Sequence, residues 1–258
     1  SDGGATWSTP KAISPRSLNP GYLGITRAPA GTTYAGRLMI AYNAYNPTAT
    51  DTTGNFVKVH YLNAPYTGAW TEVNAFSSGE GVSTGNGYRT VNVNYVPSVN
   101  QFYITIENFG YSATDGVTLN AIAVIGKSSS NGGATWSAYT RIDPAASGMY
   151  YFFPSTEIDA LNNMFVYFYE RDSGAAAQDR DATYKYYTGT WGAMITAWNT
   201  ADNLMFPCAG FAPQGTNSNR AYGAYMKGTN TDGDMEMYVI WTDNPNAATP
   251  TFVTGNGP

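Results

Sequence analysis

Short runs of hydrophobic and aromatic residues alternate along the chain with clusters of Gly, Asn, Asp and Pro. Each run has the length of a β-strand and is rich in β-branched or aromatic residues, and no segment shows the 3.6-residue period of an amphipathic helix. The pattern therefore predicts strands joined by turns. Eight runs are expected as the second and third strands of four successive units, at residues 37–42, 56–61, 101–107, 119–127, 164–170, 182–187, 221–227 and 235–242.

A further apolar stretch precedes each of these strand pairs. These stretches lie at residues 21–26, 90–95, 149–153 and 204–208. Each unit is therefore expected to begin with a strand of its own, ahead of the two already assigned.

The chain also repeats itself. The segment from Asp2 to Ser8 recurs from Asn131 to Ser137 with six of the seven positions identical, and weaker copies of the turn follow elsewhere. The repeat length of about 60 residues is too long for a helical-repeat module and fits a four-stranded propeller blade. The aromatic anchors of the repeated turns are Trp7, Trp70, Trp136, Trp191 and Phe252.

These repeats predict an all-β fold, a β-propeller of four-stranded antiparallel blades. Four full units and one leading hairpin are visible, and a five- or six-bladed ring also fits the length. Residues 1–258 are expected to form a single propeller domain. Because Ser1 falls inside a repeated turn, we expect the chain to be a piece of a longer one.

The repeated turn resembles the Asp-box, or BNR repeat, of sialidases and related β-propellers, Ser-x-Asp-x-Gly-x-Thr-Trp. The copy from Asp2 to Trp7 lacks only the leading Ser, and the copy from Ser129 to Trp136 has Asn131 in place of Asp. The resemblance implies that the motif lies between the third and fourth strands of a blade, on the outer rim. Its polar side chain would close the turn, its glycines would take positive φ, and its Trp would pack between sheets.

Composition narrows the function classes. Only 12% of residues are charged, and the net charge is -5 with 13 Lys and Arg, which argues against nucleic acid as a partner. One cysteine, Cys208, excludes an internal disulfide framework, and one histidine, His60, excludes a multi-histidine metal centre. No apolar run is long enough to span a membrane. The low-charge, Asn-, Thr- and Tyr-rich composition favours an extracellular, cell-surface or virion-surface protein.

The sialidase resemblance also suggests site residues. Arg27-Ala28-Pro29, followed by Gly36 to Ala41, is similar to the opening blade of that family, whose Arg binds a substrate carboxylate. By the same resemblance, Asp51 occupies the place of the general acid. The segment from Phe153 to Glu170 is similar to a late hairpin of the family, and Glu170 matches its final Glu. We expect Arg27, Asp51 and Glu170 to converge at the axis.

Other positions depart from the sialidase pattern. The nucleophilic Tyr position falls on Phe153 or Pro154, while Tyr151 is nearby but out of register. Of the family's three carboxylate-binding arginines, only Arg27 matches a motif. These departures argue against a true sialidase. Residues near the inner strands or near Glu170 that could still contact a substrate are Arg89, Arg171, Arg220 and Tyr151.

A different hydrolase on the same scaffold would need only two axial carboxylates, one as acid and one as base or nucleophile. Glu107 and Glu170 both end a second strand, which predicts the same structural position for both in successive blades. The alternative is that both are strand-end residues with structural partners. The carboxylates considered are Asp51, Glu107, Asp115, Glu157, Glu170 and Asp172.

Three further features have simpler readings. The segment from Asn230 to Glu236 resembles part of a calcium loop, although a tight turn explains it better, and we expect no cofactor. His60 is expected to face one side of a sheet, and Cys208 is expected to be a buried, inert thiol. The segment of residues 173–181 is expected as a long loop.

Two functions remain open at this point. The first is a non-catalytic propeller that binds a glycan or polysaccharide, or serves as an adhesive or structural module beside other domains of a larger surface protein. The second is a glycoside hydrolase or lyase with axial carboxylates. Convergence of two carboxylates and an arginine in one axial pocket would favour the second.

Overall fold

A computed structural model describes residues 19–45, 55–77, 88–111, 121–143, 149–172, 180–198, 203–211, 220–228, 236–245, 247 and 250–256. In these residues, sixteen strands form four sheets of four strands each, and the only helical segment is the short 3₁₀ turn Pro97–Val99. No helix in this part of the chain is long and apolar enough to cross a membrane.

The first two sheets contain the amino-terminal half of the chain. Sheet A consists of β1 (Asn19–Arg27), β2 (Leu38–Tyr45), β3 (Asn55–Leu62) and β4 (Thr71–Phe76). Sheet B consists of β5 (Tyr88–Val96), β6 (Gln101–Tyr111), β7 (Ala121–Ser129) and β8 (Thr140–Arg141).

The other two sheets follow in chain order. Sheet C consists of β9 (Met149–Ile158), β10 (Met164–Asp172), β11 (Arg180–Tyr187) and β12 (Ile195–Trp198). Sheet D consists of β13 (Asn203–Phe211), β14 (Ala221–Gly228), β15 (Glu236–Thr242) and β16 (Val253–Asn256).

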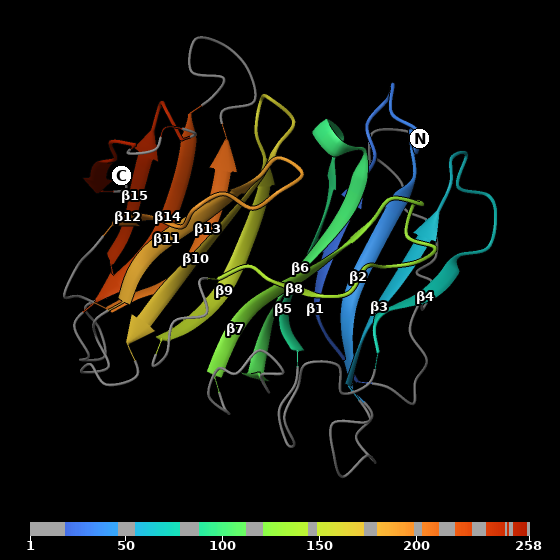
Figure 1. The fold of residues 1–258 in the computed structure, drawn as a ribbon, viewed down its shortest axis with the longest axis horizontal. Helices are drawn as coiled ribbons and strands as arrows, with labels where there is room; N and C mark the ends of the chain where they lie inside the picture. The colour runs from blue at the N-terminus through green and yellow to red at the C-terminus, as the bar shows by residue number, and fades with distance from the viewer. Residues whose placement is uncertain are drawn as a thin grey trace.

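Each sheet is an antiparallel meander in which sequence neighbours pair, and the four sheets stand side by side in chain order (Figure 1). The first strands of successive sheets contact one another: β1 meets β5, β5 meets β9, and β9 meets β13. These are therefore the inner strands, and the sheets are propeller blades. The predicted all-β fold with four-stranded antiparallel blades is confirmed, and the predicted strands match the observed ones to within a few residues.

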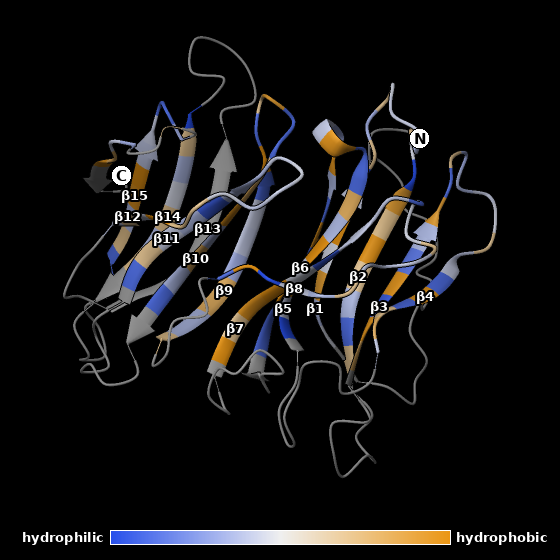
Figure 2. Ribbon diagram, viewed as in Figure 1, coloured by the Kyte–Doolittle hydropathy of each residue, from blue (hydrophilic) through white to orange (hydrophobic). Residues whose placement is uncertain are grey.

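The core is divided into three layers, each between two neighbouring blades. Figure 2 shows the hydrophobic residues that supply these layers along strands such as β2 and β7, interrupted by polar positions. Alternate residues of one strand face opposite layers, as period-two alternation requires. Ile104 and Ile106 of β6 face sheet A, for example, whereas Tyr103 faces sheet C.

Three of the aromatic anchors recognised in the sequence connect sheets B, C and D to the preceding blade. Trp136 of sheet B packs against the A–B layer, and Trp191 of sheet C packs against Tyr103 of sheet B. Phe252 of sheet D packs edge-on against Tyr184 of sheet C. All three anchors immediately precede, or lie a few residues before, the fourth strand of their blade. The prediction that the Trp of the repeated turn packs between sheets is therefore confirmed for Trp136.

The hairpin between β7 and β8 has the predicted turn geometry. Asn131 Oδ1 accepts hydrogen bonds from the Thr135 backbone N–H (2.9 Å) and from the Ser129 hydroxyl (3.0 Å). Gly132 and Gly133 have φ of 74° and 95°, conformations that favour glycine. Asn131 therefore closes the turn as an Asp would. The matching segment from Asp2 to Trp7 lies outside the described residues.

Every inner strand contains a register shift near its beginning. The shifts lie between Pro20 and Leu23 in β1, between Arg89 and Asn92 in β5, and between Met205 and Cys208 in β13. In β9, Phe152 and Ser155 flank the corresponding shift against β10. Two residues of the inner strand thus oppose one residue of the second strand at one end of every blade. Such bulges re-aim side chains and are often found beside functional sites.

Candidate active site

Glu107 lies at the bulged end of sheet B and is almost completely buried, with 1% of its surface exposed. Its Oε2 accepts a hydrogen bond of 2.9 Å from the backbone N–H of Phe153 in the next blade. Burial raises the pKa of Glu107, and the Phe153 hydrogen bond and the nearby Arg89 guanidinium partly offset this rise. The carboxyl group therefore joins sheets B and C beneath the surface.

Phe153 and Thr90 occupy the bulges of their inner strands, and both have left-handed backbones, with φ of 48° and 45°. This conformation is unusual for residues with a β-carbon and costs free energy. The hydrogen bond from Phe153 to Glu107 stabilises one of these bulges. Glu107 therefore supports the local backbone, and its carboxyl group is too enclosed to contact a large substrate.

Glu170 lies at the same end of sheet C, is half-buried, and faces a second carboxylate. Its Cα is directly opposite that of Asp181 on β11 and that of Tyr151 on β9. Burial, followed by the charge of Asp181, raises the pKa of Glu170 to about 7. A carboxyl group with this pKa is partly protonated at neutral pH, as a general acid must be.

Tyr151 lies between sheets B and C with 1% of its surface exposed. Its ring contacts Phe168 edge-on, with centroids 5.9 Å apart, and burial and the charge of Glu170 raise its pKa. A ring so enclosed has no surface for a substrate. The structure therefore leaves the predicted substrate-contacting residue Tyr151 without an accessible surface.

Glu107 and Glu170 do not occupy the same structural position, contrary to the sequence-based expectation. On β6, Ile106 opposes the bulge of β5, and Glu107 is the next residue. On β10, Phe168 opposes the bulge of β9, and Glu170 is two residues further along. A one-residue offset turns a side chain to the other face of its sheet. Because their sheets are neighbours, Glu107 faces sheet C and Glu170 faces sheet B, so both point toward the same layer.

Arg27 lies at the other end of the inner strands. It is exposed at the last residue of β1 and lines a cavity of about 450 Å³ together with Glu157 of β9. On β10, Phe165 lies opposite Glu157 and is five positions from Glu170, which is about 17 Å of extended chain. The structure therefore does not bring Arg27 together with Glu170. Arg27 ends a first strand whereas Glu170 lies near the end of a second strand, and antiparallel neighbours end at opposite edges of a sheet.

Two other predicted residues cannot be placed. Asp51 and Asp115 lie outside the described residues. Arg171 and Asp172 end β10, directly beyond Glu170, but only their backbones are described. Arg89 is exposed at the start of β5 and lies opposite Glu107, so it is the predicted arginine that belongs to the Glu107 end of the axis.

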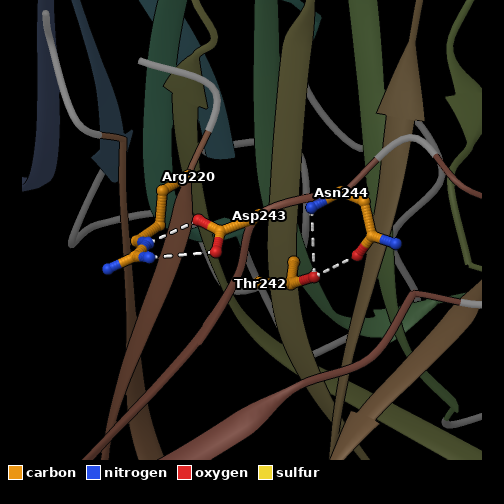
Figure 3. Close-up of polar contacts among 4 residues, drawn as sticks. All are labelled: Arg220, Thr242, Asp243 and Asn244. Carbon is orange, nitrogen blue, oxygen red and sulfur yellow. Dashed lines mark hydrogen bonds and ion pairs between the residues drawn. The ribbon is translucent and has the colours of Figure 1, made fainter. Parts of the chain in front are cut away.

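Arg220 has a structural partner. It forms two hydrogen bonds with Asp243, of 2.6 and 2.9 Å, which hold the start of β14 to the end of β15 (Figure 3). Beside this pair, the Thr242 hydroxyl donates a 2.7 Å hydrogen bond to Asn244 Oδ1 and accepts one from the Asn244 backbone N–H. This cluster stabilises a turn at the end of the blade opposite Glu170.

Three minor features can be compared with their predictions. His60 is buried in β3 and stacks on Tyr42, whose hydroxyl lies 3.1 Å from Nε2, so it faces one side of sheet A as expected. The side chain of Cys208 and residues 229–235 of the suggested calcium loop lie outside the description. Among described residues, no group of three or more His, Cys, Asp or Glu side chains could hold a metal ion.

Asp181 is the residue at this site that the sequence interpretation missed. It was assigned to a long loop of residues 173–181, whereas β11 begins at Arg180 and places Asp181 opposite Glu170. The usable signal was hairpin symmetry: once Tyr187 pairs with Met164, the antiparallel register fixes Asp181 against Glu170. The arrangement can supply one carboxyl group that carries a proton near neutral pH and one neighbouring carboxylate.

No family model matches this chain, and no curated protein matches it by sequence. Among solved structures it is similar to a Penicillium chrysogenum alpha-L-arabinanase complexed with arabinobiose, with a TM-score of 0.62 and 14% identity over 91% of this chain. An alpha-L-arabinofuranosidase of Fusarium graminearum (TM-score 0.60, 13% identity, 94% of this chain) and the intramolecular trans-sialidase from Ruminococcus gnavus (0.62, 7%, 93%) are also similar.

The chain spans 66%, 71% and 70% of the lengths of these three chains. At such low identities the likeness concerns the fold. It shows that this chain has the sialidase-like β-propeller fold that the repeats predicted.

Proposed function

We propose that this chain acts on a glycan as a glycoside hydrolase, with Glu170 as the general acid. The observation that carries the proposal is the position of the half-buried Glu170 directly opposite Asp181 on the neighbouring strand. Burial and the charge of Asp181 raise the pKa of Glu170 to about 7. A general acid works best when its pKa lies near the working pH. The proposal also draws support from the glycan-acting enzymes that share the fold, and it includes an extracellular or cell-surface setting.

Asp181 is proposed as the second carboxylate of the reaction. Side chains directly opposite on antiparallel strands have Cβ atoms about 4.5–5.5 Å apart. This spacing of the Cβ atoms places both carboxyl groups on the same face of the sheet and close enough to act on one glycosidic bond, as the paired carboxyl groups of retaining glycosidases do. In this scheme Glu170 protonates the glycosidic oxygen, which leaves with the departing sugar, while Asp181 attacks or stabilises the anomeric carbon. Water then hydrolyses the remaining glycosyl group, with Glu170 accepting its proton.

The test is release of reducing ends from linear arabinan, sialyllactose and a panel of plant and microbial polysaccharides. Glu170→Gln should lower kcat at least about 100-fold on any substrate that the parent chain cleaves, because general acid catalysis contributes that much. Glu236→Gln is the matched control, since Glu236 is exposed on sheet D, where it accepts a hydrogen bond from the Tyr238 hydroxyl. Equal rates for parent and E170Q would exclude the proposed acid.

The second candidate is a non-catalytic glycan-binding or adhesive module of a larger surface protein. It is favoured by the burial of Glu107 and Tyr151, and by the distance of Arg27 from Glu170 along the inner strands. A glycan array that detects binding, combined with no release from any bound glycan, would support this candidate over hydrolysis.

A further inference from the structure

The cavity at the other end of the inner strands belongs to neither of these carboxylates. It has a volume of about 450 Å³ and is formed by the carboxyl-terminal halves of β1, β5 and β9. This volume lies within the range of about 300–1,000 Å³ that is usual for small-molecule sites. The lining residues with polar side chains include Thr26, Arg27, Asn92, Asn94, Thr156 and Glu157.

Hydrogen bonds between blades fix the amide side chains of this cavity. Asn92 Nδ2 donates a 2.6 Å hydrogen bond to the Pro154 carbonyl of the next blade. The Thr156 hydroxyl of that blade donates to Asn94 Oδ1. Each bond joins β5 to β9 and sets the orientation of one amide. The cavity wall is therefore organised before any ligand arrives, which lowers the entropy cost of binding.

The wall between β1 and β5 is equally tight. A β-carbon on Gly24 would lie 2.8 Å from the Val93 backbone nitrogen, so glycine lets these two strands approach closely. The Tyr95 backbone N–H donates to the Thr26 hydroxyl at 3.3 Å, across the same junction. Three blades are thus held together around the cavity by contacts of their inner strands.

The fixed amides leave complementary groups for a ligand. An amide side chain has one oxygen acceptor and two N–H donors. Asn92 uses its nitrogen toward Pro154, which leaves its oxygen, and Asn94 uses its oxygen toward Thr156, which leaves its NH₂ group. Arg27 adds a guanidinium donor fork and Glu157 adds a carboxylate acceptor at the same cavity.

We propose that this cavity is a saccharide-binding site that takes one or two sugar residues through their hydroxyl groups. A sugar hydroxyl both donates and accepts, so neighbouring hydroxyls suit a wall on which amide oxygen, amide NH₂, guanidinium and carboxylate groups alternate. The mixture of charges favours a hydroxyl-rich ligand over an apolar one. This site lies at the end of the axis opposite Glu170, so it would hold a glycan apart from the place proposed for cleavage.

The proposal does not depend on hydrolysis, and binding tests it directly. Arabinobiose, cellobiose, lactose and galacturonic acid are titrated into the full chain by ¹H–¹⁵N NMR and calorimetry. Asn94→Asp preserves the acceptor for Thr156 but replaces the NH₂ donor with a carboxylate, and Arg27→Met removes the guanidinium at similar length. Asn74→Asp makes the same change at an exposed position of β4, away from the cavity.

We expect at least one probe to bind the parent chain, and N94D and R27M to weaken that binding about tenfold each, the usual effect of losing a hydrogen bond to a charged group or donor. N74D should bind as the parent does. Binding of galacturonic acid alone, lost in R27M, would support the site and identify an acidic sugar. No binding by any probe, or equal binding by N94D and R27M, would overturn it. So would loss of binding in E170Q with N94D unaffected.

Discussion

Glu170 and Asp181 face each other directly across strands β10 and β11, so two carboxylates share one cross-strand position of sheet C. Two carboxylates directly opposite each other destabilise a sheet, and protonation of one carboxyl group removes this repulsion. Burial of Glu170 is the larger cause and the charge of Asp181 the second, and together they raise the pKa of Glu170 to about 7. The pair therefore holds one proton at a pH where an isolated Glu would have lost it.

Asp181→Asn should lower the pKa of Glu170. The substitution removes the neighbouring negative charge, whereas burial, the larger cause, still holds the pKa above its ordinary value of 4.5. A ¹³C NMR titration of the glutamate carboxyl groups measures this pKa directly. In any pH–rate profile, the fall in rate on the alkaline side should move to lower pH by the same amount. Asp243→Asn is the control, because Asp243 is paired with Arg220 at the opposite end of its own blade. An unchanged Glu170 pKa in D181N would contradict the proposed coupling.

The pH dependence of stability should also report Glu170. Its pKa is higher in the folded chain than its ordinary value of 4.5, so folding favours the protonated form. The stabilisation that this group contributes is present below about pH 4.5 and is lost as the pH rises toward 7. Thermal melts across this window should therefore show a Tm difference between E170Q and the parent chain that moves in favour of E170Q as the pH rises. A constant difference would contradict the raised pKa.

The fold could be predicted from sequence because its determinants are local. Hairpin turns, strand-length apolar runs and aromatic anchors recur about every 60 residues, and the anchors of sheets B, C and D each pack against the preceding blade. Trp136 and Trp191 illustrate this, since both lie just before the fourth strand and contact the neighbouring sheet. Such regularities need no knowledge of how distant segments meet.

The site was less predictable because it depends on register and direction. Glu107 and Glu170 differ by one residue in their position relative to the bulge of the neighbouring inner strand, and this difference decides which face of its sheet each side chain occupies. No residue type in the sequence marks the positions of these bulges. Asp181 was missed because the composition of residues 173–181 suggested a loop, whereas strand β11 begins at Arg180 and includes Asp181. Arg27 matched a family motif in sequence, but it ends a first strand, whereas Glu170 lies near the end of a second strand, so the antiparallel sheets place them at opposite ends of the axis.

The two indole anchors should respond differently to removal of the ring nitrogen. Trp191 Nε1 donates a 3.1 Å hydrogen bond to the Tyr103 hydroxyl of sheet B. Trp136 Nε1 is buried without a hydrogen-bond partner among the described residues. Trp191→Phe should therefore cost about 1 kcal/mol more than Trp136→Phe, the net value of a hydrogen bond added to a similar loss of volume. Chemical denaturation measures both, and equal costs would contradict the role assigned to the Trp191 bond.

Glu107 should prove to be a structural acceptor whose charge is dispensable. Glu107→Gln retains a side-chain oxygen for the Phe153 N–H, and it removes a carboxyl group whose ionisation burial already disfavours. Glu107→Leu keeps a similar volume but leaves that N–H without its acceptor inside the protein, at a cost of about 1–3 kcal/mol. E107L should therefore be less stable than E107Q by roughly that amount in urea denaturation.

The same comparison separates a structural role for Glu107 from a catalytic one. Because the pKa of Glu107 is raised, the parent chain loses stability relative to E107Q as the pH increases. If Glu107 only holds the Phe153 bulge, E107Q should retain most of any glycan cleavage, and E107L should lose it in proportion to its disturbed backbone. A folded, equally stable E107Q that has lost cleavage by two orders of magnitude would instead make Glu107 a catalytic carboxylate. It would then remove Asp181 from that role, since Glu170 requires one partner.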